Sequence, residues 1–245
     1  MTTPSQEHNE QGDFLREFFK RWPGFYYAAV ILFGPVWFVG LSALGFLKRY
    51  AYPGTTLNVG SGPRVLAPDV INIDVTKYPH VAIIADATKL PFEDASVARI
   101  VSDNVLEHVE LPEAAVSEAA RVLLPGGYFY VSTPFLYPFH SSPHDYTRWT
   151  GLGLKSLLSR HGFEIVQFGV RAGPFSVLVL WLSYFIASLL CFGSARVYTL
   201  VLNVVMVFLF PLKFLDALFA HLPFMDQMTS VFYIVGKKKE GRVVA

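Results

Sequence analysis

The hydrophobic and polar positions divide the chain into a central part with alternating patterns and two flanking parts that are long, apolar and nearly uncharged. Residues 55–172 alternate short β-rich apolar runs with stretches of helical spacing. This alternation predicts an α/β fold with a mostly parallel sheet and ligand chemistry at the carboxyl ends of its strands. The predicted strands are Thr56–Val59, Val70–Ile73, Val81–Ala85, Ala98–Ser102, Tyr128–Ser132, Glu164–Val170 and Ser230–Val235, and the predicted helices are Leu111–Leu124 and Gly151–His161.

The connections between the first three predicted strands are short. Parallel neighbours ordinarily need a dozen or more connecting residues, most often a helix. We therefore expect reduced connections in this half of the sheet. The two predicted helices end at glycine-containing sequences, Pro125-Gly126-Gly127 and Gly162, which are common helix stops.

The N-terminal part begins with a polar tail, residues 1–12, and continues as a short amphipathic helix predicted over Asp13–Trp22. Phe25–Leu47 then carries no charged residue and is long enough to cross a bilayer. Gly34-Pro35 interrupts this run, and basic residues flank it on both sides, against the tendency of spans to keep basic residues on one side. A membrane span and a pair of interfacial or core-packed helices both remain open.

A second apolar part follows the predicted strand Glu164–Val170. Its two runs, Phe175–Phe192 and Val197–Phe210, are joined by a short turn, Gly193 to Arg196. Both runs are at or below the length that spans a bilayer upright. These runs could form a re-entrant or interfacial hairpin, or two membrane spans. They could also form a hydrophobic lid or a dimer interface.

Composition supports a membrane context and disfavours nucleic acid. Of the 245 residues, 53% are hydrophobic and only 16% are charged, whereas soluble domains are nearer one quarter charged. The net charge of +1 gives no basic excess to neutralise phosphates. The single cysteine, Cys191, excludes an intrachain disulfide and is compatible with the cytoplasm.

A glycine turn followed by an acid is the candidate ligand site. Gly60 and Gly62 end the first apolar strand, where the absence of a Cβ lets a ligand approach the backbone. Asp74 ends the second strand, in position to accept from a ribose diol. Position 65 is valine, where the dinucleotide fingerprint requires its third glycine, so the spacing disfavours NAD.

Several short motifs occur together in an ordered set over residues 55–172 and 230–237. The set resembles the class I S-adenosylmethionine-dependent methyltransferases, specifically the broad group of small-molecule methyltransferases. The resemblance implies a Rossmann-like, mostly parallel seven-stranded sheet whose last strand is antiparallel, here with apolar helical additions at the N-terminus and between the last two strands. Its motifs are Leu57-Asn58-Val59-Gly60-Ser61-Gly62, Asn72-Ile73-Asp74, Ala85-Asp86-Ala87, Leu90-Pro91-Phe92 with Asp94-Ala95-Ser96, Leu106-Glu107-His108 and Arg121 to Gly127.

The resemblance also implies a role for each cofactor-binding residue. Gly60 and Gly62 would meet the methionine moiety of S-adenosyl-L-methionine, and Asp74 would accept from both ribose hydroxyls. Asp86 and Ala87 would bind the adenine. Asp103 and Asn104, at the end of the fourth strand, would contact the other side of the cofactor. Asn58 stands where the family usually has an acid, and it completes the candidate cofactor-binding set.

The acceptor side is predicted after the fifth strand. There the chain carries His140 and then Pro143 to Thr150, a His-Asp-Tyr-x-Arg-aromatic-Thr run that resembles runs in methyltransferases found near cell-surface glycan and lipid genes. Transfer to a hydroxyl benefits from a base that titrates near neutral pH, which suits histidine. His140, His144 and Asp145 are therefore the catalytic candidates, with His108 as another histidine; each could instead hold the loop. No metal site is predicted.

The sequence thus predicts a membrane-associated S-adenosylmethionine-dependent methyltransferase with its catalytic domain facing the cytoplasm and a small, lipid-like or lipid-linked acceptor. The alternatives are a non-catalytic membrane adaptor with a degenerate methyltransferase fold and an NAD-dependent oxidoreductase. Acceptor identity, oligomeric state and the number of spans stay open. The predicted domains are 1–54 for the N-terminal tail and helices, 55–173 with 229–239 for the methyltransferase domain, and 174–228 for the apolar helical hairpin.

Overall fold

The computed structural model describes residues 32, 34–140 and 144–240. These residues form two compact units. The sheet unit comprises residues 40–135, 144–171 and 231–240, and the hairpin unit comprises residues 34–39, 136–140 and 172–230. The amphipathic helix predicted over Asp13–Trp22 lies outside the described residues, as does most of the first half of the apolar run Phe25–Leu47.

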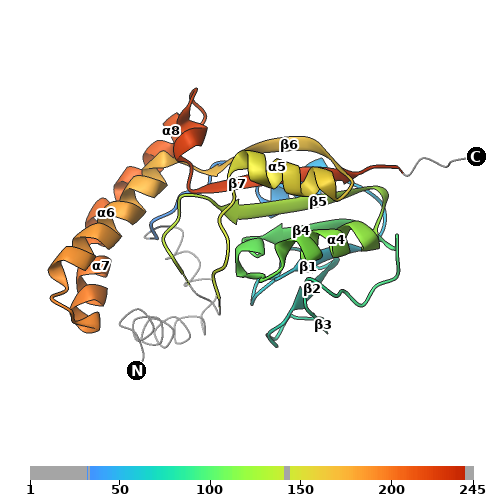
Figure 1. Cartoon of the computed structure of the whole chain (residues 1–245), viewed down its shortest axis with the longest axis horizontal. Coiled ribbons are helices and arrows are strands. Elements are labelled where there is room, and N and C mark those ends of the chain that lie inside the picture. Colours follow the sequence, from blue (N-terminus) through green and yellow to red (C-terminus); the bar gives the residue numbers. More distant parts are fainter. Residues whose placement is uncertain (1–31, 33, 141–143, 241–245) are drawn as a thin grey trace, which may run out of the picture. The chain divides into compact units, whose positions relative to one another are not determined.

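The sheet unit contains a seven-stranded sheet in the order β3-β2-β1-β4-β5-β7-β6. The pairs β1–β2, β1–β4, β2–β3 and β4–β5 are parallel, whereas β7 is antiparallel to β5. This is the Rossmann-like sheet with an antiparallel last strand that the sequence predicted (Figure 1). The strands are β1 Thr56–Val59, β2 Val70–Asp74, β3 Ile83–Ile84, β4 Val97–Asp103, β5 Leu123–Pro134, β6 Phe163–Ala172 and β7 Val231–Lys238.

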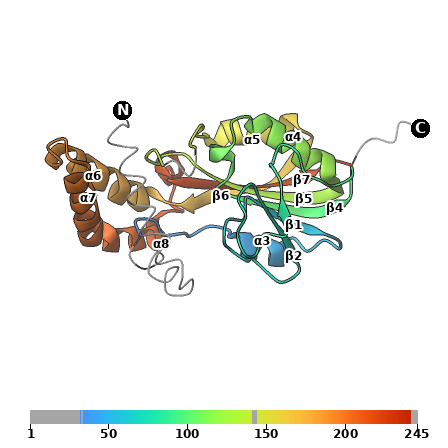
Figure 2. The same ribbon diagram turned by 90° about the horizontal axis from the view of Figure 1, so that it is seen from below.

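Helices pack on both faces of the sheet. Figure 2 shows α4 (Pro112–Val122) and α5 (Gly151–Arg160) on one face and α3 (Ala43–Arg49) on the other. The larger core lies beneath α4 and α5, where Leu57, Ile100 and Leu154 are buried. On the opposite face, Phe46 of α3 packs on Tyr130 with ring centroids 5.5 Å apart.

The described part of the apolar run Phe25–Leu47 is not a continuous helix. Residues 34–42 are non-helical, and α3 begins only at Ala43, where the Ser42 hydroxyl accepts from the Gly45 backbone N–H. Ala43 and Phe46 of α3 are buried against the sheet. A membrane span that continues to Leu47 is therefore wrong, and the core-packed alternative describes this end of the run. Gly34-Pro35 is where the sequence pattern placed the break.

Several predicted elements have different bounds in the structure, and the differences in the third strand, the first helix and the fifth strand have a structural reason. The third strand shrinks from Val81–Ala85 to Ile83–Ile84, because it lies at the sheet edge with Ile84 exposed. The helix predicted to Leu124 ends at Val122. Strand β5 then begins at Leu123, and the Pro-Gly-Gly sequence forms an irregularity where the register with β4 shifts. The short β1–β2 and β2–β3 connections contain no described helix, as expected.

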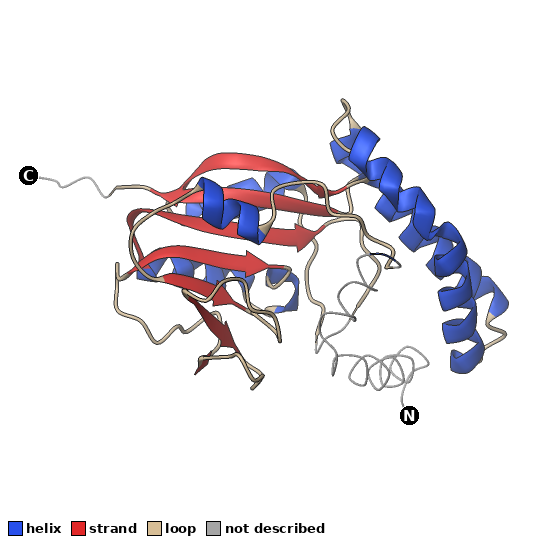
Figure 3. Ribbon diagram, turned by 180° about the vertical axis from the view of Figure 1, so that it is seen from behind, coloured by secondary structure: helices blue, strands red, loops and turns tan. Residues whose placement is uncertain are grey.

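The hairpin unit is built on two antiparallel apolar helices, α6 (Pro174–Leu190) and α7 (Ala195–Leu209), seen side by side in Figure 3. The tight turn between them has Phe192 at φ +47° and Gly193 at φ +77°. The chain then continues through short helical turns, η2 (Phe210–Leu215), α8 (Asp216–Phe219) and η3 (Met225–Met228). Among the described residues, one helical stretch, Ala195–Phe219, is long and apolar enough to cross a membrane by length and composition alone.

Two buried charges fix the root of this hairpin. The Asp216 carboxylate accepts from the backbone N–H groups of Phe175 and Ser176, both at 2.9 Å, and from the Ser176 hydroxyl at 2.6 Å. It therefore caps the first turn of α6, which has no cap from its own N-cap residue Gly173. Lys213, also fully buried, donates to the Gly34 carbonyl at 2.6 Å.

Candidate functional site

The glycine turn after β1 has the left-handed backbone that favours glycine. Gly60 has φ +68° and Gly62 has φ +54°. A Cβ at Gly60 would lie 2.5 Å from a methyl carbon of Val105, so this glycine is needed for packing against the segment after β4. A Cβ at Gly62 would meet nothing within 4 Å. Space therefore exists at Gly62 for a ligand to approach the backbone.

Asp74, the last residue of β2, connects this turn to the neighbouring strand. Its Oδ2 accepts from the Gly62 backbone N–H and its Oδ1 accepts from the Thr76 N–H, both at 2.8 Å. A third bond, from Ser61 N–H to the Ile73 carbonyl at 3.0 Å, closes the same turn. Each carboxylate oxygen has a further lone pair, and Asp74 is only half-buried, so it can also accept from a diol.

The other residues that the resemblance assigns to the cofactor lie at the carboxyl ends of their strands or just beyond. Asp86, exposed after β3, accepts at Oδ1 from the backbone N–H and the hydroxyl of Thr88, both at 2.7 Å. The neighbouring Ala87 packs at the edge of the core. Asn104, directly after β4, has φ +57° and donates its backbone N–H to the Ser132 carbonyl at 3.0 Å. A non-glycine residue at positive φ directly after a strand end marks a candidate functional position.

Asn58 has a partner within the sheet. Its side-chain amide donates to Asn72 Oδ1 at 3.0 Å, and the Asn72 amide in turn donates to the His80 carbonyl at 3.2 Å. Both asparagines are buried, so this chain of amides joins β1, β2 and the connection to β3. The structure therefore gives Asn58 a structural role, and its predicted contact with the cofactor stays a prediction.

The predicted catalytic residues divide between the two units. His144 and Asp145 belong to the sheet unit, whereas His140 belongs to the hairpin unit. The His140 ring packs on Tyr137 with centroids 4.8 Å apart, and its Nδ1 lies 3.3 Å from the Pro138 carbonyl oxygen.

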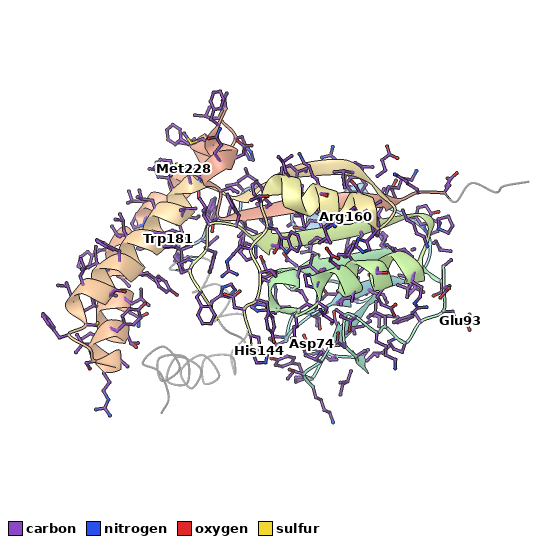
Figure 4. The ribbon with its side chains drawn as sticks, viewed as in Figure 1. Asp74, Glu93, His144, Arg160, Trp181 and Met228 are labelled. Atoms are coloured by element: carbon purple, nitrogen blue, oxygen red, sulfur yellow. The ribbon has the colours of Figure 1, made fainter. Side chains whose placement is uncertain are left out.

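In the sheet unit, Asp145 and Arg148 form an ion pair within the loop, with Oδ2 and Nη2 2.6 Å apart. Asp145 thus fixes the loop. His144 is exposed, and its ring lies beside Tyr146. Figure 4 shows His144 and Asp74 at the same end of the sheet unit and Glu93 toward the other end.

The structure brings a further residue into the site that the sequence analysis did not select. Glu107 lies in the short helix η1 (Leu106–His108), three residues beyond β4, and is fully buried. Thr133 at the end of β5 places its hydroxyl 3.4 Å from Glu107 Oε2, while Oε1 has no hydrogen-bond partner among the described residues. Burial raises the pKa of Glu107 from its ordinary value of 4.5 to about 8.

The loop from His144 to Trp149 encloses Glu107. The backbone N–H of Tyr146 donates to the Glu107 carbonyl at 2.7 Å, and Trp149 N–H donates to the Pro134 carbonyl at 3.3 Å. His108 Nδ1 contacts the His144 carbonyl oxygen at 2.5 Å. In the sequence Glu107 looked like an ordinary member of the Leu-Glu-His motif. The residues that contact it in the structure include Thr133 and Tyr146, which are 26 and 39 residues further along the chain.

Residues 61–131 match the family described as Methyltransferase domain. A probable S-adenosylmethionine-dependent methyltransferase of Mycolicibacterium smegmatis is 34% identical over 125 residues, which cover 39% of this chain and 49% of that protein. The chain thus spans about half the length of this curated relative.

Two solved structures share the fold. The [4+2]-cyclase SpnF superposes with a TM-score of 0.51 at 18% identity, covering 80% of this chain and 78% of that one. A Haemonchus contortus phosphoethanolamine N-methyltransferase, solved with phosphomonomethylethanolamine and S-adenosylhomocysteine, gives a TM-score of 0.50 at 16% identity, covering 80% of this chain and 52% of that one. Likeness at this identity shows the fold, and the cyclase illustrates that one fold carries different chemistry.

The raised pKa of Glu107 predicts a specific pH dependence of stability. Because the folded state holds the proton up to about pH 8, the stabilisation is fully present below pH 4.5 and is lost as the pH rises toward 8. Relative to Glu107→Gln, which stays uncharged, the wild type should lose free energy of unfolding by up to about 1.4 kcal/mol per pH unit across this window. Denaturant unfolding of both proteins at several pH values measures the difference.

Glu110→Gln is the matched control, since Glu110 is exposed three residues further along the chain. The free energy of unfolding of Glu110→Gln should differ little from that of the wild type, and this difference should change little with pH over the same window. A difference between wild type and Glu107→Gln that does not grow between pH 5 and pH 8 would show that Glu107 titrates normally.

Proposed function

We propose that this chain, which carries a class I S-adenosylmethionine-dependent methyltransferase domain, methylates a small, lipid-like or lipid-linked acceptor at a membrane surface. The observation that carries the proposal is the joining of two features in one chain. One is the glycine turn held by Asp74 at the carboxyl ends of β1 and β2. The other is the exposed apolar hairpin inserted between β6 and β7.

The residues of the sheet unit fit the cofactor. The open space at Gly62 would admit the methionine moiety, and the free acceptor capacity of Asp74 suits the ribose hydroxyls. Asp86 and Ala87 would bind the adenine, and Asn104 would close the pocket at the end of β4. When bound, S-adenosylmethionine supplies an electrophilic methyl group on a cationic sulfur. The protein's part is to hold the acceptor atom in line with that methyl group.

The apolar surface of the hairpin supports membrane binding. Soluble monomers rarely expose contiguous apolar patches of more than a few hundred Å². On α6, α7 and their connecting turn, large hydrophobic side chains face solvent along the whole length, with Phe192 at the tip 89% exposed. Figure 4 labels one of them, Trp181. They are Leu178, Trp181, Leu182, Phe185, Leu189, Leu190, Phe192, Val197, Leu200, Val204, Val207 and Phe208.

The distribution of charge along the hairpin supports insertion of its tip. At the root, Lys213 and Asp216 are buried in protein rather than exposed to lipid. The 17 residues of α6 would extend about 26 Å, slightly less than the roughly 30 Å of a hydrocarbon core. Arg196, at the tip, can extend its side chain to a polar interface. We therefore propose a re-entrant or interfacial anchor.

The placement of the hairpin in the chain links the anchor to the acceptor. The chain leaves the sheet after Ala172 of β6 and returns at Val231, whose register partner is Pro134 at the carboxyl end of β5. Ligands of open α/β sheets bind at this end of the strands. An acceptor resident in the membrane and reached from the cytoplasmic side fits this connectivity.

Gly62→Ala tests the cofactor site. The new Cβ enters the open space proposed for the cofactor, so S-adenosylmethionine binding should weaken at least about tenfold. The left-handed φ adds a stability cost of about 1–2 kcal/mol. Gly162→Ala is a matched control, because Gly162 also has a positive φ, +86°, and open space around it. It should show a similar stability loss with unchanged affinity, measured by calorimetric titration.

Asp74→Asn provides a second test at the same turn. The substitution removes the charge and one acceptor oxygen, so S-adenosylmethionine and S-adenosylhomocysteine should both bind at least about tenfold more weakly. Asp69→Asn, at an exposed position before β2, should bind both like the wild type. NAD should bind neither form. Absence of S-adenosylmethionine binding by the wild type would favour the non-catalytic adaptor.

The hairpin anchor is tested in the full-length protein by adding charge to its apolar surface. Simultaneous Phe185→Asp, Leu189→Asp and Phe192→Asp should release the protein from phosphatidylethanolamine–phosphatidylglycerol vesicles, because each aspartate would have to be desolvated in lipid. Leu111→Asp with Leu152→Asp places charge on equally exposed leucines of the sheet unit and should leave binding unchanged. Vesicle flotation measures both; retention of the hairpin variant would contradict the proposed anchor.

A further inference from the structure

Glu107 is a buried acid whose chemistry is not explained by the packing around it. Its side chain is inaccessible to solvent, yet Oε1 has no hydrogen-bond partner in the described part of the chain, and Oε2 has only the 3.4 Å contact with Thr133. His108 Nε2 is 3.9 Å from Oε1, beyond hydrogen-bonding distance. Burying a carboxyl group with so few hydrogen bonds costs free energy. Ionisable groups whose pKa is shifted by burial cluster at functional sites.

The position of Glu107 relates it to the cofactor site. It follows β4, whose neighbours in the sheet are β1 and β5. The segment leading to it contacts the glycine turn, since the side chain of Val105 packs against Gly60. On its other side, Thr133 comes from the carboxyl end of β5. Glu107 is thus placed between the turn assigned to the methionine moiety and the strand after which the acceptor side begins.

Resting on the function proposed above, we infer that Glu107 is the general base of the reaction and that the methyl acceptor is a hydroxyl group. The acceptor oxygen attacks the methyl carbon, so that an O–CH₃ bond forms and the C–S bond breaks, its electron pair returning to sulfur. The hydroxyl proton passes to Oε1 of Glu107. A cationic sulfur and a carboxylate become a neutral thioether and a neutral acid, and no further reactant is needed.

The surroundings of Glu107 suit this exchange of a proton. Charge neutralisation of this kind is favoured in a water-excluded site, because charged groups held away from water are costly and both charges disappear in the step. Within the sheet unit, the groups that face Glu107 are Asp103 at the end of β4, His108 on its own helix, and Asp145 and Arg148 on the loop that follows His144. Arg148 lowers the pKa of Glu107 and the two aspartates raise it, while desolvation is the largest influence. A base that titrates near working pH is the most effective.

The inference makes a prediction that needs no knowledge of the acceptor. S-Adenosylmethionine carries the sulfonium charge and S-adenosylhomocysteine does not, but the two are otherwise closely alike. If Glu107 faces the sulfonium, its ionisation must strengthen binding of the first ligand relative to the second, because coupling between two bindings is reciprocal. The ratio of the S-adenosylhomocysteine Kd to the S-adenosylmethionine Kd should therefore rise roughly tenfold or more from about pH 6 to about pH 9.

Calorimetric titration of the full-length protein in detergent measures this ratio. It should rise in the wild type and in Glu110→Gln and stay flat in Glu107→Gln. Should Glu107→Gln fail to fold, His108→Gln removes the imidazole that lies 3.9 Å from Oε1 and must retain the rise. A flat ratio in the wild type, or a rise that persists in Glu107→Gln, overturns the role of Glu107. Failure of either ligand to bind the wild type overturns the proposed cofactor site instead, so the two failures are distinguishable.

Discussion

The hydrogen bonds that Asp74 accepts from Gly62 and Thr76 are the interaction on which the candidate site depends. They hold the end of β2 against the turn after β1, and so they fix where the two glycines present their backbone. The left-handed conformations of this turn favour glycine, and the turn also packs against Val105 after β4. Three strand ends are thereby joined, and a substitution at any of these positions should disturb the others.

The sequence predicted this part of the fold well, because its signals are local. Short apolar runs bounded by glycine and aspartate mark the ends of parallel strands, and those ends meet at one edge of a sheet. The match over residues 61–131 and the strand order confirm the methyltransferase fold. The sequence pattern was less accurate in two places. The edge strand β3 has only two residues, and the end of the apolar run to Leu47 forms α3, which packs on Tyr130.

Burial set by distant contacts could not be predicted. Lys213 and Asp216 follow the apolar run Val197–Phe210, and the fold turns both inward, where Asp216 caps α6 some 40 residues earlier. Glu107 looked like part of a family motif, and its enclosure depends on a loop whose own conformation is fixed by the pair of Asp145 and Arg148. In each case the residue itself is charged, and only tertiary contacts decide whether water reaches it.

Asp216 and Glu107 show how the same functional group can be buried for different reasons. Asp216 accepts three hydrogen bonds, so its charge is compensated and its removal would uncap a helix. Glu107 has one long contact and one oxygen without a partner among the described residues. Stability alone would favour a glutamine or an apolar residue at position 107, since either avoids an uncompensated carboxylate. A glutamate there is better explained by a proton that must be accepted during a reaction than by the packing of the folded protein.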